Sequence, residues 1–324
     1  MSLTKYSFIL FILLAFTVSC TAEDDLEVPI QKTPVNYQTL DEFGEYHVLI
    51  IGNSLSRDAF SYVPSVIIDL CPNITIDFNI YYKSGVGLSS HWNSIKQGKT
   101  DHELDTFSQS EYRWDTTIGI SGDELIRSKE WDLVILQEGN VICRQYERFC
   151  NNIQTVSSYI KSIHPNTKIA YVMVPAQPEG NSTLGDYSSD EVWSMFASAT
   201  QSLEENQDVD YIIPCGTAIQ NARHTYLDDL GNFGHFSYEG VHLQEGIPCM
   251  IEAFTATQCF FDIFTINASV QKSGFQITQQ IVSTIRVPGR HGGVIQGSEK
   301  DYTLCKQCAL FAVGNPYGIS TYDR

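Results

Sequence analysis

The stretch from His47 to Asp58 constrains the fold of this chain more than any other part of it. An apolar run over 48–51 ends in Gly52-Asn53-Ser54, and apolar residues then recur at helical spacing over 59–70. This pattern predicts a buried strand, a tight turn and a helix that packs back on the sheet. In an open parallel sheet such a turn lies outside the carboxyl end of the strand, where ligands bind.

The same alternation of strands and helices continues along the chain. Runs rich in β-branched and apolar residues predict further strands over 74–82, 131–137, 168–174 and 210–214. Helices are expected over 58–70, 153–163, 190–205, 217–222 and 243–264, with a short hairpin over 112–120. Strands that alternate with helices are typical of a mainly parallel sheet covered on both faces, so we predict an α/β fold.

The pattern of the N-terminal residues predicts a targeting segment. Lys5 precedes an apolar run over 8–16 that is too short for an ordinary membrane-spanning helix. The run ends in Thr17-Val18-Ser19-Cys20, and an acidic stretch follows. A cysteine placed after small residues at this point resembles a bacterial lipoprotein signal, which implies cleavage before Cys20 and a lipid on that residue. Ordinary secretion with an incidental cysteine is the alternative.

This resemblance divides the chain into a signal peptide over 1–19, a polar tether over 20–40 and one domain over 41–324. It implies an exported protein held at the bacterial outer membrane through a lipid on Cys20. The acidic run after Cys20 resembles the export signature of surface-exposed lipoproteins, so exposure at the cell surface is a further expectation.

The charge of the chain limits its partners. Removal of residues 1–19 takes away only Lys5 and leaves 19 basic against 38 acidic residues, a net charge of −19. Such a charge repels nucleic acid and anionic lipid headgroups. We therefore expect no nucleic-acid partner, membrane contact only through the anchor at Cys20, and a small-molecule or glycan substrate.

Two other motifs do not indicate a cofactor or a metal. Cys305 and Cys308 have the spacing of a zinc or redox pair, but no second such pair and no suitably spaced histidine accompany them. On a helix they would simply lie one turn apart. The glycine-rich segment over 288–293 lacks the ending of a phosphate loop, and we interpret it as a surface loop.

Ser54 is a candidate nucleophile, and His242 is a candidate base. The backbone amides of a first helical turn favour negative charge, so a serine there could attack a carbonyl, although Ser54 could also merely cap the helix. His242 follows Glu239 by three residues across a glycine. In a turn, that spacing lets the carboxylate reach Nδ1 of the imidazole while Nε2 stays free to take a proton.

Taken in chain order, these pieces resemble the SGNH (GDSL-like) hydrolase superfamily. The matching residues are Gly52-Asn53-Ser54, Gly85 after the second strand, the polar turn after the strand at 131–137, and Glu239-x-x-His242. The chain is most similar to a branch of that superfamily found in bacterial lipoproteins and described as a domain of unknown function. The resemblance implies a three-layer sandwich with a flavodoxin-like sheet.

The resemblance also implies roles for individual residues. Ser54 corresponds to the nucleophile and His242 to the general base, and the amides of Ser54 and Gly85 would form an oxyanion hole. A side-chain amide, from Gln137 or from Asn140, would complete the hole, with Gln137 slightly favoured because it directly ends its strand.

The sequence departs from the superfamily pattern at three places. The block after the third strand is Gln137-Glu138-Gly139-Asn140 where the pattern has Gly-x-Asn-Asp. Asn53 stands where the name-motif has aspartate. Glu239 replaces the usual aspartate, and it would either orient His242 or leave a Ser–His dyad.

Four residues are candidates for substrate binding: Asn53, His91, Trp92 and Arg223. A tryptophan face suits a sugar ring, although His91 and Trp92 could equally pack at the start of a helix. Arg223 could hold a substrate carboxylate or pair with Asp228 or Asp229 at the surface.

The sequence thus predicts a serine esterase that removes a small acyl group, with acetyl groups on carbohydrate as the favoured substrate. The carbohydrate part follows from the resemblance and from export. A lipase is less favoured because no long apolar lid segment is visible. The alternative from another class is a carbohydrate-binding surface lipoprotein of the same fold that has lost catalysis.

Overall fold

The structure is a computed structural model that describes residues 44–290 and 293–320. The predictions for the signal peptide, the tether and the anchor at Cys20 lie outside these residues. Within the described part of the chain, no helix combines the length and the apolar character that a membrane crossing needs.

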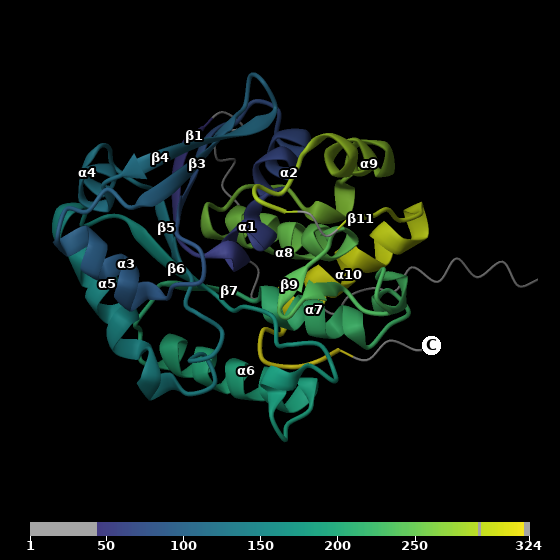
Figure 1. The fold of residues 1–324 in the computed structure, drawn as a ribbon. Coiled ribbons are helices and arrows are strands. Elements are labelled where there is room, and N and C mark those ends of the chain that lie inside the picture. Colours follow the sequence, from purple (N-terminus) through teal and green to yellow (C-terminus); the bar gives the residue numbers. More distant parts are fainter. Residues whose placement is uncertain (1–43, 291–292, 321–324) are drawn as a thin grey trace, which may run out of the picture.

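A seven-stranded sheet forms the centre of the molecule (Figure 1). Its order is β4-β3-β2-β1-β5-β6-β7. The strands are β1 (Glu45–Gly52), β2 (Thr75–Tyr82), β3 (His102–Ser108), β4 (Arg113–Ile120), β5 (Leu133–Leu136), β6 (Lys168–Val172) and β7 (Tyr211–Ile213). All neighbours pair in parallel except β2–β3 and β3–β4, so a hairpin closes one edge. The predicted strands are confirmed, but the hairpin expected over 112–120 is longer, because 113–120 form the single strand β4, which pairs with β3.

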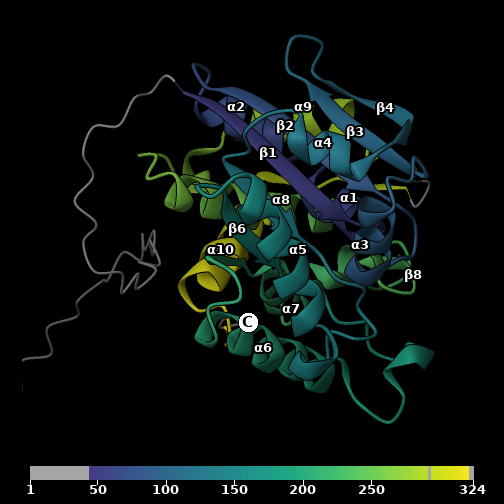
Figure 2. The same ribbon diagram turned by 90° about the vertical axis from the view of Figure 1, so that its left-hand side faces the viewer.

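Helices cover both faces of the sheet, which gives the predicted three layers (Figure 2). One layer holds α3 (Leu88–Lys96), α4 (Gly122–Arg127), α5 (Cys150–Ile163) and α6 (Ser189–Glu205). The other holds α1 (Ser54–Phe60), α2 (Val63–Leu70), α7 (Cys215–Arg223), α8 (Ile247–Ile263), α9 (Phe275–Thr284) and α10 (Glu299–Gly314). Short 3₁₀ turns lie at η1 (Tyr146–Arg148), η2 (Ser182–Leu184), η3 (Asp228–Leu230) and η4 (Val270–Lys272).

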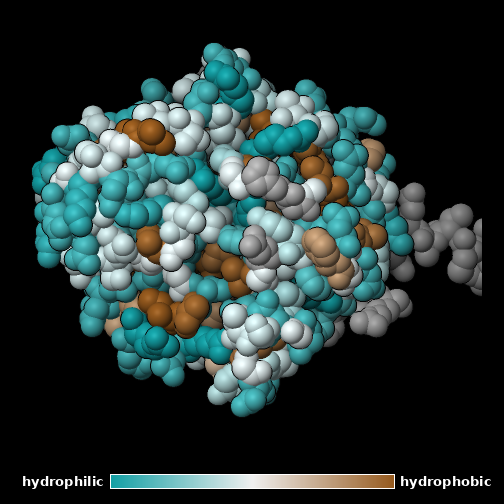
Figure 3. Space-filling model, in the orientation of Figure 1, coloured by the Kyte–Doolittle hydropathy of each residue, from teal (hydrophilic) through white to brown (hydrophobic). Residues whose placement is uncertain are grey.

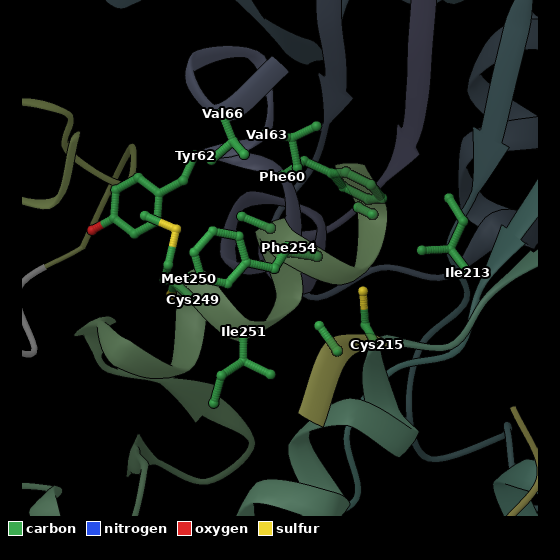
Figure 4. Packing of buried hydrophobic residues seen from close by; sticks show 14 of the residues in the cluster. Phe60, Tyr62, Val63, Val66, Ile213, Cys215, Cys249, Met250, Ile251 and Phe254 are labelled. Atoms are coloured by element: carbon green, nitrogen blue, oxygen red, sulfur yellow. The ribbon is translucent and has the colours of Figure 1, made fainter. Parts of the chain in front are cut away.

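The alternation of side chains along β1 divides the core in two. Val48 and Ile50 face the layer that contains α8, while Leu49 and Ile51 face the layer that contains α5. All four are fully buried, as expected for a central strand covered on both faces. Figure 4 shows Phe60, at the end of α1, among the apolar side chains of α8. This packing fixes α1, which begins at Ser54, against the core.

Two predicted helices differ from those observed. The expected helix over 58–70 is two helices, because Pro64 lies in the first turn of α2, where its missing N–H costs nothing. The expected helix over 243–264 begins only at Ile247. Before it come a small hairpin of β8 (Ser237–Glu239) and β9 (His242–Leu243), and then β10 (Glu245–Gly246).

The C-terminal segment, which the sequence left unassigned, wraps back onto the core. β11 (Val294–Ile295) pairs in parallel with β10, and Arg290, which follows α9, donates to the Leu243 carbonyl of β9. Cys305 and Cys308 lie fully buried on α10, one turn apart.

Gly246 provides a test of this packing. Its φ is +92°, and a Cβ there would lie 2.0 Å from the Ile295 carbonyl oxygen. We expect Gly246→Ala to lower the free energy of unfolding by about 2 kcal/mol or more, because both the left-handed backbone and the contact with β11 resist a side chain. Urea unfolding measures this loss.

The matched control is Gly314→Ala, at the end of α10, where a Cβ meets no atom within 4 Å. It should leave the free energy of unfolding within about 1 kcal/mol of the wild-type value. Equal losses in the two variants would contradict the close approach of β10 and β11.

Candidate active site

The turn after β1 presents Ser54 at the start of α1. Asn53 is the N-cap residue, and its Oδ1 accepts the Leu55 amide at 3.0 Å. The interpretation of Ser54 as the helix cap is therefore wrong, because the neighbouring asparagine takes that role. Ser54 is left partly exposed at the carboxyl edge of the sheet.

The β8–β9 hairpin brings His242 to this serine. Gly240, with φ +59°, begins its two-residue turn, and Glu239 pairs with His242 across the strands. The Oγ of Ser54 and the Nε2 of His242 are 3.2 Å apart, although 188 positions separate the residues in the chain. The predicted approach of these two side chains is confirmed.

The carboxylate at the other ring nitrogen comes from α1. Nδ1 of His242 lies 3.3 Å from Oδ2 of Asp58, and the same oxygen accepts the Leu243 amide at 3.3 Å. The prediction assigned this position to Glu239, whose side chain lies outside the described part of the structure. Helix geometry explains Asp58: residues four apart lie on one face, so Ser54 and Asp58 point to the same side of α1 and the imidazole bridges them.

Asp58 also contacts a segment to which the sequence assigned no role. Arg290, in the glycine-rich loop after α9, makes an ion pair with Oδ1 of Asp58. The segment interpreted as a surface loop therefore places a buried side chain next to the site. Sequence reasoning missed both residues, although the spacing of Ser54 and Asp58 and the single arginine in that loop were signals for them.

The turn after β2 lies beside the serine. β1 and β2 end together, with Gly52 opposite Tyr82. Nδ2 of Asn53 donates to the Val86 carbonyl at 2.9 Å and ties the two turns. Gly85 has φ +67°, which favours glycine. Among the described residues, none accepts a hydrogen bond from the amide of Ser54 or of Gly85.

Gln137 does not complete an oxyanion hole. It is fully buried, its Oε1 accepts the Asn53 amide at 2.8 Å and the Ser56 hydroxyl at 3.1 Å, and its Nε2 donates to the Glu138 carbonyl. Both ends of the amide therefore support the turn before Ser54, and the preference for Gln137 was wrong. Asn140, which is partly exposed, remains the candidate.

Glu138 joins the turns after β2 and β5. It is fully buried, and its Oε1 accepts the amides of Leu88 at 3.0 Å and Gly139 at 2.7 Å. A Cβ on Gly87 would lie 1.9 Å from this oxygen, so the two turns are in close contact. Burial raises the pKa of Glu138 although these donors oppose the shift. Asn140 is thereby held near the turn that contains Gly85.

The structure contradicts two of the predicted substrate contacts. Asn53 is 5% exposed, and both ends of its amide serve the turn. His91 is fully buried, and its Nδ1 lies 2.9 Å from Nε2 of His102. Burial, together with the charge of His102, lowers the pKa of His91 to about 3. We therefore assign both a structural role, because the Asn53 amide is occupied by the turn and His91 is buried against a second histidine.

The other two lie on helices next to the sheet. Trp92, on α3, packs edge-on against Tyr159 of α5 with ring centroids 5.1 Å apart. Arg223, at the end of α7, donates from Nη1 to the Ala176 carbonyl at 2.9 Å, and its Nε and Nη2 are buried. Within the described part of the chain no hydrogen bond joins Arg223 to Asp228 or Asp229, so the predicted surface pairing is not found, and the predicted substrate contact stays a prediction.

The chain belongs to the family described as "Domain of unknown function (DUF4886)", which it matches over residues 47–285. The expected branch of unknown function is thereby confirmed. A comparison with curated protein sequences found no match.

Solved structures of similar fold include a DUF4886 family protein from Bacteroides uniformis. The two chains are 19% identical with a TM-score of 0.67, and the similarity covers 85% of this chain and 97% of that one. A putative SGNH hydrolase from Slackia heliotrinireducens follows, at 15% identity and a TM-score of 0.45, over 67% and 99% of the two chains. An acetylxylan esterase from Geobacillus stearothermophilus is 12% identical with a TM-score of 0.44, over 69% and 96%. At these identities the likeness is one of fold.

The buried His91 makes stability depend on pH. Its pKa falls from 6.5 to about 3 on folding, so below pH 6.5 only the unfolded chain takes up this proton and the folded state loses stability. We expect this histidine to contribute a loss of about 2 kcal/mol between pH 6.5 and pH 5. Comparing urea unfolding of wild type and His91→Gln at the two pH values tests this. An identical loss in both chains would contradict the assignment.

Proposed function

We propose that this protein is a serine ester hydrolase whose catalytic residues are Ser54, His242 and Asp58. The observation that carries the proposal is the hydrogen-bonded row they form, with Ser54 Oγ 3.2 Å from His242 Nε2 and His242 Nδ1 3.3 Å from Asp58 Oδ2. Asp58 takes the place expected for Glu239.

The carboxylate selects the tautomer of the histidine. An ionised carboxylate only accepts hydrogen bonds, so the proton of a neutral His242 lies on Nδ1, facing Asp58. Nε2 then carries a lone pair directed at the Ser54 hydroxyl. The serine oxygen attacks the ester carbonyl while Nε2 takes its proton, and Asp58 stabilises the resulting imidazolium.

Backbone amides stabilise the charge that develops on the carbonyl oxygen. The amide of Ser54 and the amide of Gly85 supply two donors, and the side chain of Asn140 is proposed as a third. Each donor of this kind contributes about 3 kcal/mol to the transition state in related enzymes. The dipole of α1 adds to the same field because its amino end faces the oxygen.

The rest of the cycle uses the same groups. The imidazolium gives its proton to the alcohol oxygen as the C–O bond breaks, which leaves an acyl group on Ser54. A water molecule then gives a proton to His242 and attacks the acyl carbon. The tetrahedral intermediate collapses, the acid departs, and Ser54 recovers its proton.

We propose a small acyl ester, with acetyl on carbohydrate as the leading case. The face that carries the β8–β9 hairpin is mostly hydrophilic, with hydrophobic residues only in small separate patches (Figure 3). A polar alcohol suits such a surface better than a lipid does. The sequence resemblance and the predicted export point the same way, with Cys20 proposed as the lipid anchor outside the cytoplasm.

A pair of neighbouring serines tests the nucleophile. We expect a fluorophosphonate probe to label Ser54 of the purified mature chain, and Ser54→Ala to lose at least about 10³-fold of the rate on p-nitrophenyl acetate. Ser56→Ala is the matched control, because Ser56 is fully buried and donates to Gln137. Mass spectrometry locates the label.

Labelling that persists in Ser54→Ala, or hydrolysis at the wild-type rate by that variant, would refute the proposed nucleophile. A wild-type chain that takes no label yet binds glycan would instead support the non-catalytic binding protein.

The identity of the catalytic acid is a separate prediction. Asp58→Asn should lower kcat by about 10³-fold or more, because an amide at this position stabilises the wrong tautomer of His242. Glu239→Gln should lower kcat less than about tenfold, because the His242 Nδ1 already has a carboxylate partner. Steady-state kinetics on the two variants distinguish the residues, and the reverse order of effects would return the role to Glu239.

A further inference from the structure

The loop between α9 and β11 carries a buried arginine beside the proposed site. The Arg290 side chain is 4% exposed and the Asp58 side chain 2%. The guanidinium makes an ion pair with Oδ1 of Asp58, and its Nη1 donates to the Leu243 carbonyl at 3.0 Å. Oδ2 of the same carboxylate accepts from His242 and from the Leu243 amide, so Asp58 and Arg290 together bind the N–H and the carbonyl of Leu243 in β9.

Asp58 needs this cation. A carboxylate removed from water is costly unless a positive charge or several donors compensate it. Arg57 precedes Asp58 in α1, but its guanidinium donates to Asp105 at 2.6 and 3.0 Å and to Glu103 at 2.7 Å. It also lies over the Tyr82 ring, 3.3 Å from the centroid. The charge of Arg57 is therefore already matched on β3, which leaves Arg290 for Asp58.

Arg290 lies far from the β8–β9 hairpin in the sequence, in the segment that follows α9, and the fold brings it next to Asp58. Gly289 has φ +73°, and β11 anchors the far end of the loop to β10. The Arg290 guanidinium also lies 5.3 Å from the centroid of the Tyr238 ring, and that ring stacks beside His242. The family match ends at residue 285, so Arg290 lies beyond the segment by which the family is recognised.

We propose that Arg290 is a positioning residue of the Ser54–His242–Asp58 site, which keeps Asp58 ionised and holds the β8–β9 hairpin against α1. The inference rests on the proposed function, because it assigns a role within that site. Arg290 acts through Asp58 and Leu243, and makes no chemical step of its own.

This role has a signature in the titration of His242. Among the described residues that face the imidazole are Ser54 and Asp58 from α1 and Tyr238 from β8. The charge of Arg290 lies behind Asp58, with the charge of Arg57 close to it, and the Glu239 side chain lies outside the described residues. A positive charge near the ring opposes its protonation. Loss of Arg290 should therefore let His242 keep its proton to higher pH, or let Asp58 take one, and either event removes the active form of the pair.

The experiment uses Arg290→Met in the mature chain, with NMR detection of the His242 ring and steady-state kinetics on p-nitrophenyl acetate. We expect the midpoint of the His242 titration, and the acid limb of kcat/KM with it, to move upward by about one pH unit. We also expect kcat to fall at least about tenfold while KM changes little. Arg286→Met is the control, because the acceptors of Arg286 among the described residues are the carbonyls of Val282 and Ile285 around the end of α9.

Arg290→Lys distinguishes the effect of the positive charge from the effect of the guanidinium geometry. It also provides the test if Arg290→Met does not fold. It keeps the charge but loses the fork that contacts Asp58 and Leu243 together. We expect an unmoved titration midpoint and a lower kcat. A folded Arg290→Met with the wild-type midpoint and kcat, or a folded Arg290→Lys with the wild-type kcat, would overturn the proposal. A purely structural role would lower the melting temperature of Arg290→Met and leave the His242 midpoint unchanged.

The NMR measurement keeps this proposal distinct from the proposed function. If wild type shows no Ser54-dependent hydrolysis, the proposed function fails, yet the His242 titration still reports whether Arg290 sets the electrostatics of the histidine. If hydrolysis depends on Ser54 and the titration does not respond to Arg290, the further inference alone fails.

Discussion

The carboxylate of Asp58 is the interaction on which the arrangement of the site depends. One of its oxygens contacts the imidazole of His242 and the backbone of β9, and the other contacts Arg290. These partners come from segments that are far apart in the chain and share no strand of the main sheet. A buried charge with directional partners fixes the hairpin against α1 more specifically than apolar packing could.

The sheet itself could be predicted because its signals are local. The apolar run before Ser54 and the turn that ends it predict a strand and a functional edge, and the meeting of Ser54 with His242 follows once both lie at that edge. Asp58 was not predicted because we expected the catalytic acid close to His242 in the sequence. It lies instead one helical turn after Ser54 on α1. Arg290 escaped for another reason: the return of a C-terminal loop to the first helix is a long-range contact with no local pattern.

The wrong assignments share a physical cause. Gln137 and Asn53 directly follow strands and His91 lies on the helix after β2, and polar residues at these places predict contacts with a ligand when only the sequence is known. In the structure each is buried and fills a hydrogen-bonding need of the neighbouring turns or of a second histidine. Tight turns at a sheet edge leave backbone amides that must be satisfied, and side chains close by satisfy them. A sequence does not indicate which way a side chain leaves such a turn.

The division of the site between a helix and a hairpin has a mechanical consequence. Ser54 and Asp58 both lie on α1, which packs against α8 in the core. Their separation is therefore set within one helix. The imidazole is carried on a two-stranded ribbon of a few residues, and it bridges them only while that ribbon stays seated. Displacement of the hairpin would therefore break its contacts with Ser54 and with Asp58 together. Assembly of the site thus depends on the docking of this one small hairpin against α1.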